Sequence, residues 1–141
     1  MIYGFGLPTR GPLAQPDAAK VVLEKAEELK FGYVSVADHI VIPKQIKAVY
    51  PYSDTGEPPF PADGECLEQL TFMSYIAAVT SKIRILSSVM VVPHRNPVHT
   101  AKIISTIDVL SNGRVTIGCG AGWMEEEFDA IGTQPFKERG K

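Results

Sequence analysis

The sequence alternates between short apolar runs rich in β-branched residues and longer segments whose apolar residues recur at helical spacing. The runs with strand character are residues 2–7, 33–37, 83–92 and 114–119. Strands that alternate with helices form parallel sheets, because each connection must return to the same end of the sheet. We therefore predict an α/β fold with four parallel strands in sequential order. Right-handed helical connections would place three helices on one side of that sheet.

Start and stop signals delimit the three predicted helices. The first is expected to open at Pro16 and to stop at Gly32, a residue suited to a left-handed helix end. The second covers residues 67–82 and is apolar on more than one side. The third begins at Asn96 and Pro97 and ends at residues 112–113. The apolar faces are predicted from Val22, Ala26 and Leu29 in the first helix and from Ile103, Ile107 and Leu110 in the third.

The second β/α unit is longer than its neighbours. The strands start at residues 2, 33, 83 and 114, so the intervals are 31, 50 and 31 residues. The excess lies in a Pro-rich insertion at residues 43–64, in the loop after the second strand. Its prolines and aromatic residues are Pro43, Pro51, Pro58, Pro59, Pro61, Tyr50, Tyr52 and Phe60. Long loops after parallel strands lie where α/β proteins bind ligands, which favours a binding or lid role over a decorative insertion.

Length and composition indicate one globular domain over residues 1–141. The chain has 141 residues, of which 45% are hydrophobic and 21% are charged. An eight-unit TIM barrel typically needs about 250 residues, so the pattern fits the first four units of a partial (β/α)8 barrel. Four parallel strands cannot close into a barrel and leave two open edges. We expect a truncated or split product, or a half-barrel that associates as a homo-oligomer.

The charge pattern argues against nucleic-acid and membrane partners. The net charge is −2 and no cluster of Lys and Arg stands out. The N-terminal residues lack a signal-peptide pattern, and no apolar run is long enough for a transmembrane helix. We therefore expect a cytoplasmic protein without an anchor. Cys66 and Cys119 lack metal-ligand spacing, so no metal site is expected, and both are predicted to be small buried groups.

Three alternating glycines, Gly118, Gly120 and Gly122, begin at the end of the fourth strand and continue directly after it. Glycine has no Cβ, so these positions would let a planar or phosphorylated ligand approach the main chain closely. A dinucleotide fingerprint would place its last glycine where Trp123 stands, and we reject that interpretation. A tight turn after a buried strand is the alternative for each glycine.

Several segments together resemble the bacterial luciferase-like monooxygenases. They are VADH at residues 36–39, SSVMVVPHRNP at 87–97, SNGR at 111–114 and GAGW at 120–123. The resemblance runs along the whole chain and is strongest to the branch that uses the deazaflavin coenzyme F-420, with FMN-dependent members as near relatives. It implies a TIM barrel in which a flavin-type ring lies over the carboxyl ends of the strands.

The resemblance also implies roles for individual residues. Ser88 and Val89 fall where the family has a non-prolyl cis peptide bond behind the cofactor ring. Asp38, Ala121, Gly122 and Trp123 are the other expected cofactor-binding residues, although the sugar-phosphate dehydrogenases of the F-420 branch have a proton-donating glutamate where Trp123 stands. Trp123 could instead stack near the ring, wall an apolar pocket or anchor the helix that follows.

His39 is the expected catalytic acid or base, because histidine titrates near neutral pH. A structural role for this histidine remains the alternative. Asp38 would either orient the imidazole of His39 or form hydrogen bonds with the backbone. His94 and His99 are assigned to the surface. Residues 125–127, all glutamates, are expected to form a solvated first helical turn.

The leading hypothesis is a flavin- or F-420-dependent oxidoreductase that moves hydride between its cofactor and a small organic substrate. Oxygen insertion would be added if the cofactor is FMN. Barrels of this kind hold the cofactor phosphate with later units, so we expect ring contacts here without a phosphate site. The alternative is a non-catalytic half-barrel that binds a ligand or partner.

Overall fold

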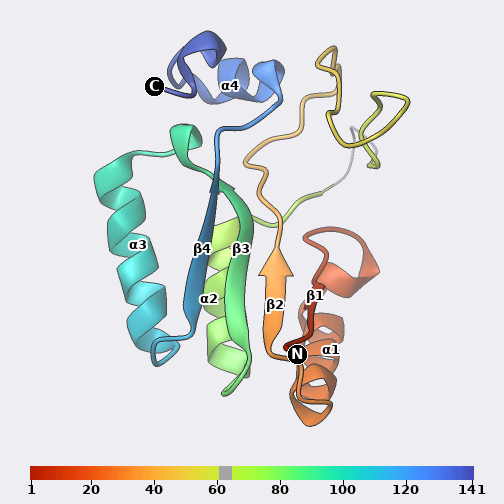
Figure 1. Ribbon diagram of the computed structural model, residues 1–141, viewed down its shortest axis with the longest axis vertical. Helices are drawn as coiled ribbons and strands as arrows, with labels where there is room; N and C mark the ends of the chain where they lie inside the picture. The colour runs from red at the N-terminus through yellow and green to blue at the C-terminus, as the bar shows by residue number, and fades with distance from the viewer. Residues whose placement is uncertain (61–64) are drawn as a thin grey trace.

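A computed structural model describes residues 1–60 and 65–141 and contains the predicted four-stranded parallel sheet (Figure 1). The strands are β1 (Gly4–Gly6), β2 (Tyr33–Val36), β3 (Arg84–Val91) and β4 (Val115–Gly120), in the order β1-β2-β3-β4. The helices are α1 (Pro16–Glu28), α2 (Gln69–Val79), α3 (Pro97–Leu110) and α4 (Glu125–Ile131), with 3-10 turns η1 (Pro12–Ala14), η2 (Val92–His94) and η3 (Phe136–Glu138). Neighbouring strands pair in parallel throughout, which confirms the α/β prediction and matches part of a TIM barrel. Pro61, part of the predicted insertion, lies outside the described residues.

The pairing of β3 with β4 is interrupted by a bulge. The register shifts between Ser87 and Met90, and the predicted cis peptide bond joins Ser88 to Val89 within this bulge. A Cβ at Gly118 would lie 2.6 Å from the Ser87 carbonyl oxygen, and one at Gly120 would lie 2.5 Å from Val89 Cγ2. These two glycines are therefore required by β3, a neighbour within the chain. The packing against β3 therefore explains Gly118 and Gly120 without a ligand, and the approach of a ligand to this backbone stays a prediction.

Helix α1 differs from its prediction at its end and on its face. The buried residues are Ala19, Leu23 and Ala26, whereas Leu29, which directly follows the last helical residue Glu28, is 62% exposed. Lys30 adopts the left-handed conformation, with φ of 60°, so Gly32 is not the left-handed residue. Gly32 is needed for another reason, since a Cβ there would lie 2.3 Å from Ile2 Cγ2.

Helices α2 and α3 begin with side-chain caps. The Glu68 carboxylate accepts a hydrogen bond from the Thr71 amide at 2.7 Å, and Asn96 accepts one from the His99 amide at 3.0 Å. Such caps satisfy amides that lack partners within the helix. Helix α2 is buried on several sides, as predicted, through Gln69, Leu70, Phe72, Met73, Ile76 and Ala77. On α3 Ile107 is buried, but Leu110 at the last position is 65% exposed, contrary to its prediction.

Two charged side chains fix the turn from α2 into β3. The guanidinium of Arg114 donates to the carbonyl oxygens of residues 77, 80, 83 and 111 at 2.7–3.0 Å. The Glu27 carboxylate accepts hydrogen bonds from the consecutive amides of residues 81, 82 and 83. Burial raises the pKa of Glu27, but these amide hydrogen bonds outweigh it and bring the pKa below its ordinary value. Both sets of hydrogen bonds hold the turn at the amino end of the sheet, opposite α4 (Figure 1).

Both cysteines are more accessible than expected. Cys66 is partly exposed and Cys119 is exposed, and both are free thiols. Cys119 lies on β4, which has a neighbouring strand on one side only among the described residues. None of the helices in the described ranges combines the length and apolar character needed to cross a bilayer.

Candidate functional site

A cavity of about 650 Å³ lies at the carboxyl ends of the strands. Its lining includes every residue singled out for the site, namely Asp38, His39, Ser88, Val89, Ala121, Gly122 and Trp123. They lie in the second half of β3 or just after β2 and β4, and parallel pairing brings these segments to one edge of the sheet. The structure therefore brings together residues that are up to 85 positions apart, from Asp38 to Trp123. Their functional roles stay predictions.

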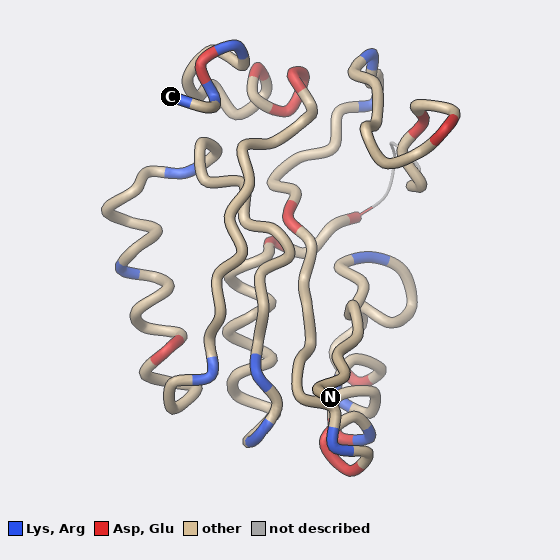
Figure 2. The backbone as a smooth tube through the Cα atoms, viewed as in Figure 1, with Lys and Arg blue, Asp and Glu red and all other residues tan. Residues whose placement is uncertain are grey.

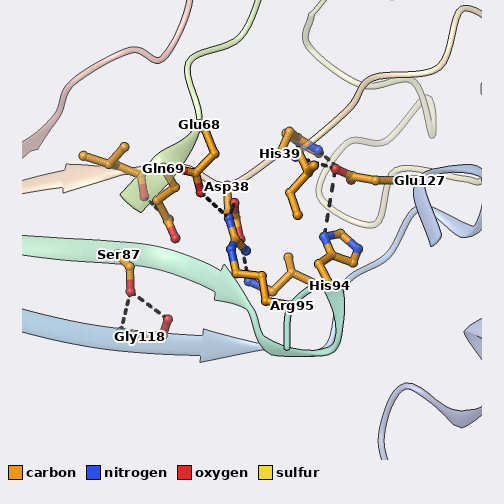
Figure 3. A network of polar contacts seen from close by, with 12 residues as sticks. Asp38, His39, Glu68, Gln69, Ser87, His94, Arg95, Gly118 and Glu127 are labelled. Atoms are coloured by element: carbon orange, nitrogen blue, oxygen red, sulfur yellow. Dashed lines mark hydrogen bonds and ion pairs between the residues drawn. The ribbon is translucent and has the colours of Figure 1, made fainter. Parts of the chain in front are cut away.

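Asp38 is held by the backbone and by an arginine, not by His39 (Figure 3). Its fully buried carboxylate accepts a hydrogen bond from the Val91 amide at 2.8 Å. It also forms a two-pronged ion pair with Arg95, at 2.6 and 2.7 Å. Arg95 donates a further hydrogen bond to Glu68 at 2.8 Å. The network joins the ends of β2 and β3 to the cap of α2, and the sequence interpretation missed both Arg95 and Glu68.

His39 has a different carboxylate partner. Its Nδ1 lies 2.9 Å from Oε2 of Glu127 in α4, and the Glu127 side chain is only 2% exposed. The other oxygen, Oε1, accepts hydrogen bonds from the amides of Ile40 at 2.8 Å and Val41 at 3.2 Å. The prediction of a fully solvated turn at residues 125–127 is therefore wrong for Glu127, whereas Glu125 is exposed.

The sequence does contain a signal for the burial of Glu127. Met124 lies three positions before Glu127, and Phe128 directly follows it. At helical spacing all three residues lie on one face. Both apolar residues are buried, with exposures of 1% and 2%. Helical spacing around the glutamate would thus have predicted a buried carboxylate.

A second histidine lies beside Glu127. His94 Nδ1 is 4.0 Å from Glu127 Oε1, and the His94 side chain is 1% exposed, so its assignment to the surface is wrong. Burial lowers the pKa of His94 although the charge of Glu127 acts in the opposite direction. Neither ring nitrogen has a hydrogen-bond partner among the described residues. His99 is exposed, as predicted. In the described ranges no group of three or more His, Cys, Asp or Glu side chains is arranged to hold a metal ion.

Aromatic residues of the long loop reach this cavity. The ring of Phe60 lies 5.3 Å from that of His39, and the ring of Tyr50 lies 5.1 Å from that of Trp123, both edge to face. The loop is tied to α4, because Glu126 accepts hydrogen bonds from the amides of Lys47 at 2.7 Å and Ala48 at 3.2 Å. Figure 2 shows acidic residues of α4 at the same end of the molecule as this loop.

The lining suits a flat, largely apolar ring. Val89 is 45% exposed, and Gly120, Ala121 and Gly122 contribute backbone with little or no side chain. Trp123 adds an aromatic surface, and His94 adds buried ring nitrogens that have no partner in the described part of the chain. Buried polar atoms are normally satisfied, so these nitrogens are suited to contact a bound molecule or water. Apolar walls with a few polar groups are typical of cofactor sites.

Comparison with known proteins settles the family. The model of the luciferase-like monooxygenase family matches residues 4–141. The chain belongs to this family. An uncharacterized protein of Mycobacterium tuberculosis is 34% identical over 141 residues, which cover 99% of this chain and 48% of that protein. The chain thus spans about half the length of this relative.

Solved structures of similar fold include enzymes with different cofactors. The monooxygenase RslO1 from Streptomyces bottropensis has a TM-score of 0.70 and 22% identity, over 99% of this chain and 39% of that chain. The coenzyme F-420-dependent tetrahydromethanopterin reductase from Methanopyrus kandleri has a TM-score of 0.64 and 24% identity, over 93% and 30%. A type II Baeyer-Villiger monooxygenase from Pseudomonas putida, solved with FMN, has a TM-score of 0.66 and 16% identity, over 99% and 37%.

Proposed function

We propose that this chain supplies the ring-binding wall of a flavin- or F-420-dependent oxidoreductase of the luciferase-like family. Such an enzyme would move hydride between the cofactor and a small organic substrate, with oxygen insertion where the cofactor is FMN. Family membership and the FMN- and F-420-dependent structural neighbours support the cofactor class. The observation that carries the proposal is the cavity at the strand ends, which is lined by all seven expected residues.

The residues of this chain would divide the work between binding and proton handling. Val89 and the backbone of residues 120–122 would pack against the ring, and Trp123 would wall the cavity beside it. His39 would hold or accept a proton next to the bound molecules, since it lines the cavity and has a carboxylate partner. The cofactor, when bound, supplies the hydride chemistry, and the protein positions it and excludes water.

Association between copies belongs to the same proposal. Among the described residues, β1 and β4 each have a neighbouring strand on one side only. Open edges present unpaired backbone groups to other chains. Light scattering on the purified chain is expected to report a species larger than a monomer. A stable monomer at high concentration would exclude association between copies.

Titration of the purified chain with FMN and with F-420, followed by fluorescence, tests the ring-binding role. Saturable binding is expected for at least one of them. The variant Val89→Asp is expected to weaken it at least tenfold, because the substitution places a charge on the apolar wall. The matched control is Val98→Asp, which changes a residue that is 79% exposed on α3. Absence of saturable binding, or equal losses in both variants, would favour a non-catalytic half-barrel.

A further inference from the structure

The buried carboxylate of Glu127 joins His39 to the start of the long loop (Figure 3). One oxygen accepts hydrogen bonds from the Ile40 and Val41 amides, and the other lies 2.9 Å from Nδ1 of His39. Since His39 comes directly before these two residues, one carboxylate holds both the imidazole ring and the backbone that carries it. This arrangement fixes the ring more firmly than a single hydrogen bond would.

The protonation state of Glu127 determines which ring nitrogen of His39 carries the proton. Burial raises the pKa of the Glu127 carboxyl group, but the hydrogen bond and charge of His39 and the two amides outweigh it. The pKa therefore lies below its ordinary value, and the group is ionised at neutral pH. An ionised carboxylate only accepts hydrogen bonds, so Nδ1 of His39 must be the donor.

We propose that Glu127 is a positioning residue that locks His39 in the tautomer protonated at Nδ1. The other nitrogen, Nε2, then carries no proton in the neutral ring and acts as an acceptor. No hydrogen bond to a described residue occupies Nε2, and His39 lines the cavity. A ligand that contacts Nε2 must therefore present a donor, such as a hydroxyl group. This last step rests on the proposed function, whereas the tautomer does not.

The other charged groups near the pair do not compete for His39. Asp38 is bound to Arg95 and to the Val91 amide, and Glu126 is bound to the amides of residues 47 and 48. His94 lies 4.0 Å from Glu127 and is held neutral by burial. Glu127 is therefore the carboxylate that sets the state of His39.

Two-bond ¹H–¹⁵N correlation spectra of the ligand-free chain in alkaline buffer report the tautomer directly. For the wild type, His39 is expected to show a protonated Nδ1 and an unprotonated Nε2. In Glu127→Gln the side-chain oxygen can still accept the loop amides, while its NH2 group donates to Nδ1. The two ring-nitrogen signals are therefore expected to exchange positions. Glu126→Gln removes the same charge from the same helix without touching His39, and its spectrum is expected to match the wild type.

Either of two results would overturn the proposal. One is a wild-type His39 protonated at Nε2, which requires no variant to fold. The other is a folded Glu127→Gln protein that keeps the wild-type tautomer. Titration with FMN and F-420 in parallel separates this inference from the proposed function, because loss of cofactor binding leaves the tautomer result intact.

Discussion

The carboxylate of Asp38, which lines the candidate cavity, forms a buried, two-pronged ion pair with the guanidinium of Arg95, at 2.6 and 2.7 Å. Asp38 follows β2 and Arg95 follows β3, so the pair fixes the two strand ends relative to each other. His39 is the next residue after Asp38. The ion pair therefore sets the backbone position from which the proposed proton-handling residue projects.

Removal of one partner from this pair is expected to destabilise the fold strongly. Asp38→Ala leaves Arg95 with a single carboxylate and leaves the Val91 amide without its acceptor. Loss of one partner of a buried pair costs about 3–5 kcal/mol, and chemical denaturation would measure it. Glu68→Gln is the control, because Glu68 is 39% exposed. It should cost less than about 1 kcal/mol. Equal losses would show that Asp38 has no special structural role.

The bulge in β3 predicts a sharp difference between two strand glycines. Gly118→Ala would place a Cβ 2.6 Å from a backbone oxygen, whereas Gly6→Ala would place one 3.7 Å from the Ser35 hydroxyl. Overpacking of this kind costs about 1–3 kcal/mol. Thermal unfolding should therefore show a clearly lower Tm for Gly118→Ala and nearly the wild-type Tm for Gly6→Ala. A wild-type Tm for Gly118→Ala would mean that β4 can shift freely from the bulge.

The sequence was sufficient for the sheet and for the residues that gather at its edge. Strand order follows from alternation and chain connectivity, and the ends of parallel strands meet at one edge regardless of side-chain detail. The cis bond between Ser88 and Val89 came from family resemblance, since no local pattern encodes it. The predicted burial of Leu29 and Leu110 is wrong, because tertiary contacts decide whether an apolar residue at a helix end is covered.

The pairing of charged groups could not be predicted in the same way. His39 and Glu127 are 88 positions apart, and the contact exists because α4 lies beside the segment that follows β2. The run of three glutamates at residues 125–127 suggested solvation, whereas one of them is buried by its apolar neighbours on the helix. Burial of His94 likewise depends on Phe128, whose ring lies 4.5 Å away.

Acid should weaken the fold partly through Glu27. The pKa of Glu27 is below its ordinary value of 4.5, so its stabilising contribution is complete above that value and is lost as the pH falls through the folded-state pKa. Glu27→Gln should flatten the decline of the unfolding free energy below pH 4.5. The comparison is Glu28→Gln, which removes a charge from the same helix at an exposed residue. Identical acid profiles for Glu27→Gln and the wild type would contradict a stabilising role of the hydrogen bonds to the Glu27 carboxylate.

The long loop should loosen locally when its tie to α4 is removed. Glu126→Ala takes away the acceptor for the amides of Lys47 and Ala48 but leaves those of Ile40 and Val41 bound to Glu127. A hydrogen bond contributes about 0.5–1.5 kcal/mol, so exchange of the first pair should rise roughly 2- to 10-fold. Hydrogen exchange read by NMR resolves the two pairs, and an equal rise in both would indicate general unfolding of the loop.

The phosphate group of FMN should add little to the affinity of the cavity for a flavin. Val89, Trp123 and the glycines offer contacts to a ring. Arg10, the basic residue of the lining, is stacked on Phe60 at 4.3 Å from the ring centroid, and Glu127 brings negative charge to the lining. The chain of 141 residues is therefore expected to bind FMN and riboflavin with similar, micromolar or weaker affinity. Calorimetry with both ligands measures this difference. Sub-micromolar binding of FMN, with much weaker binding of riboflavin, would reveal a phosphate site within these residues and make the half-barrel a complete cofactor-binding unit.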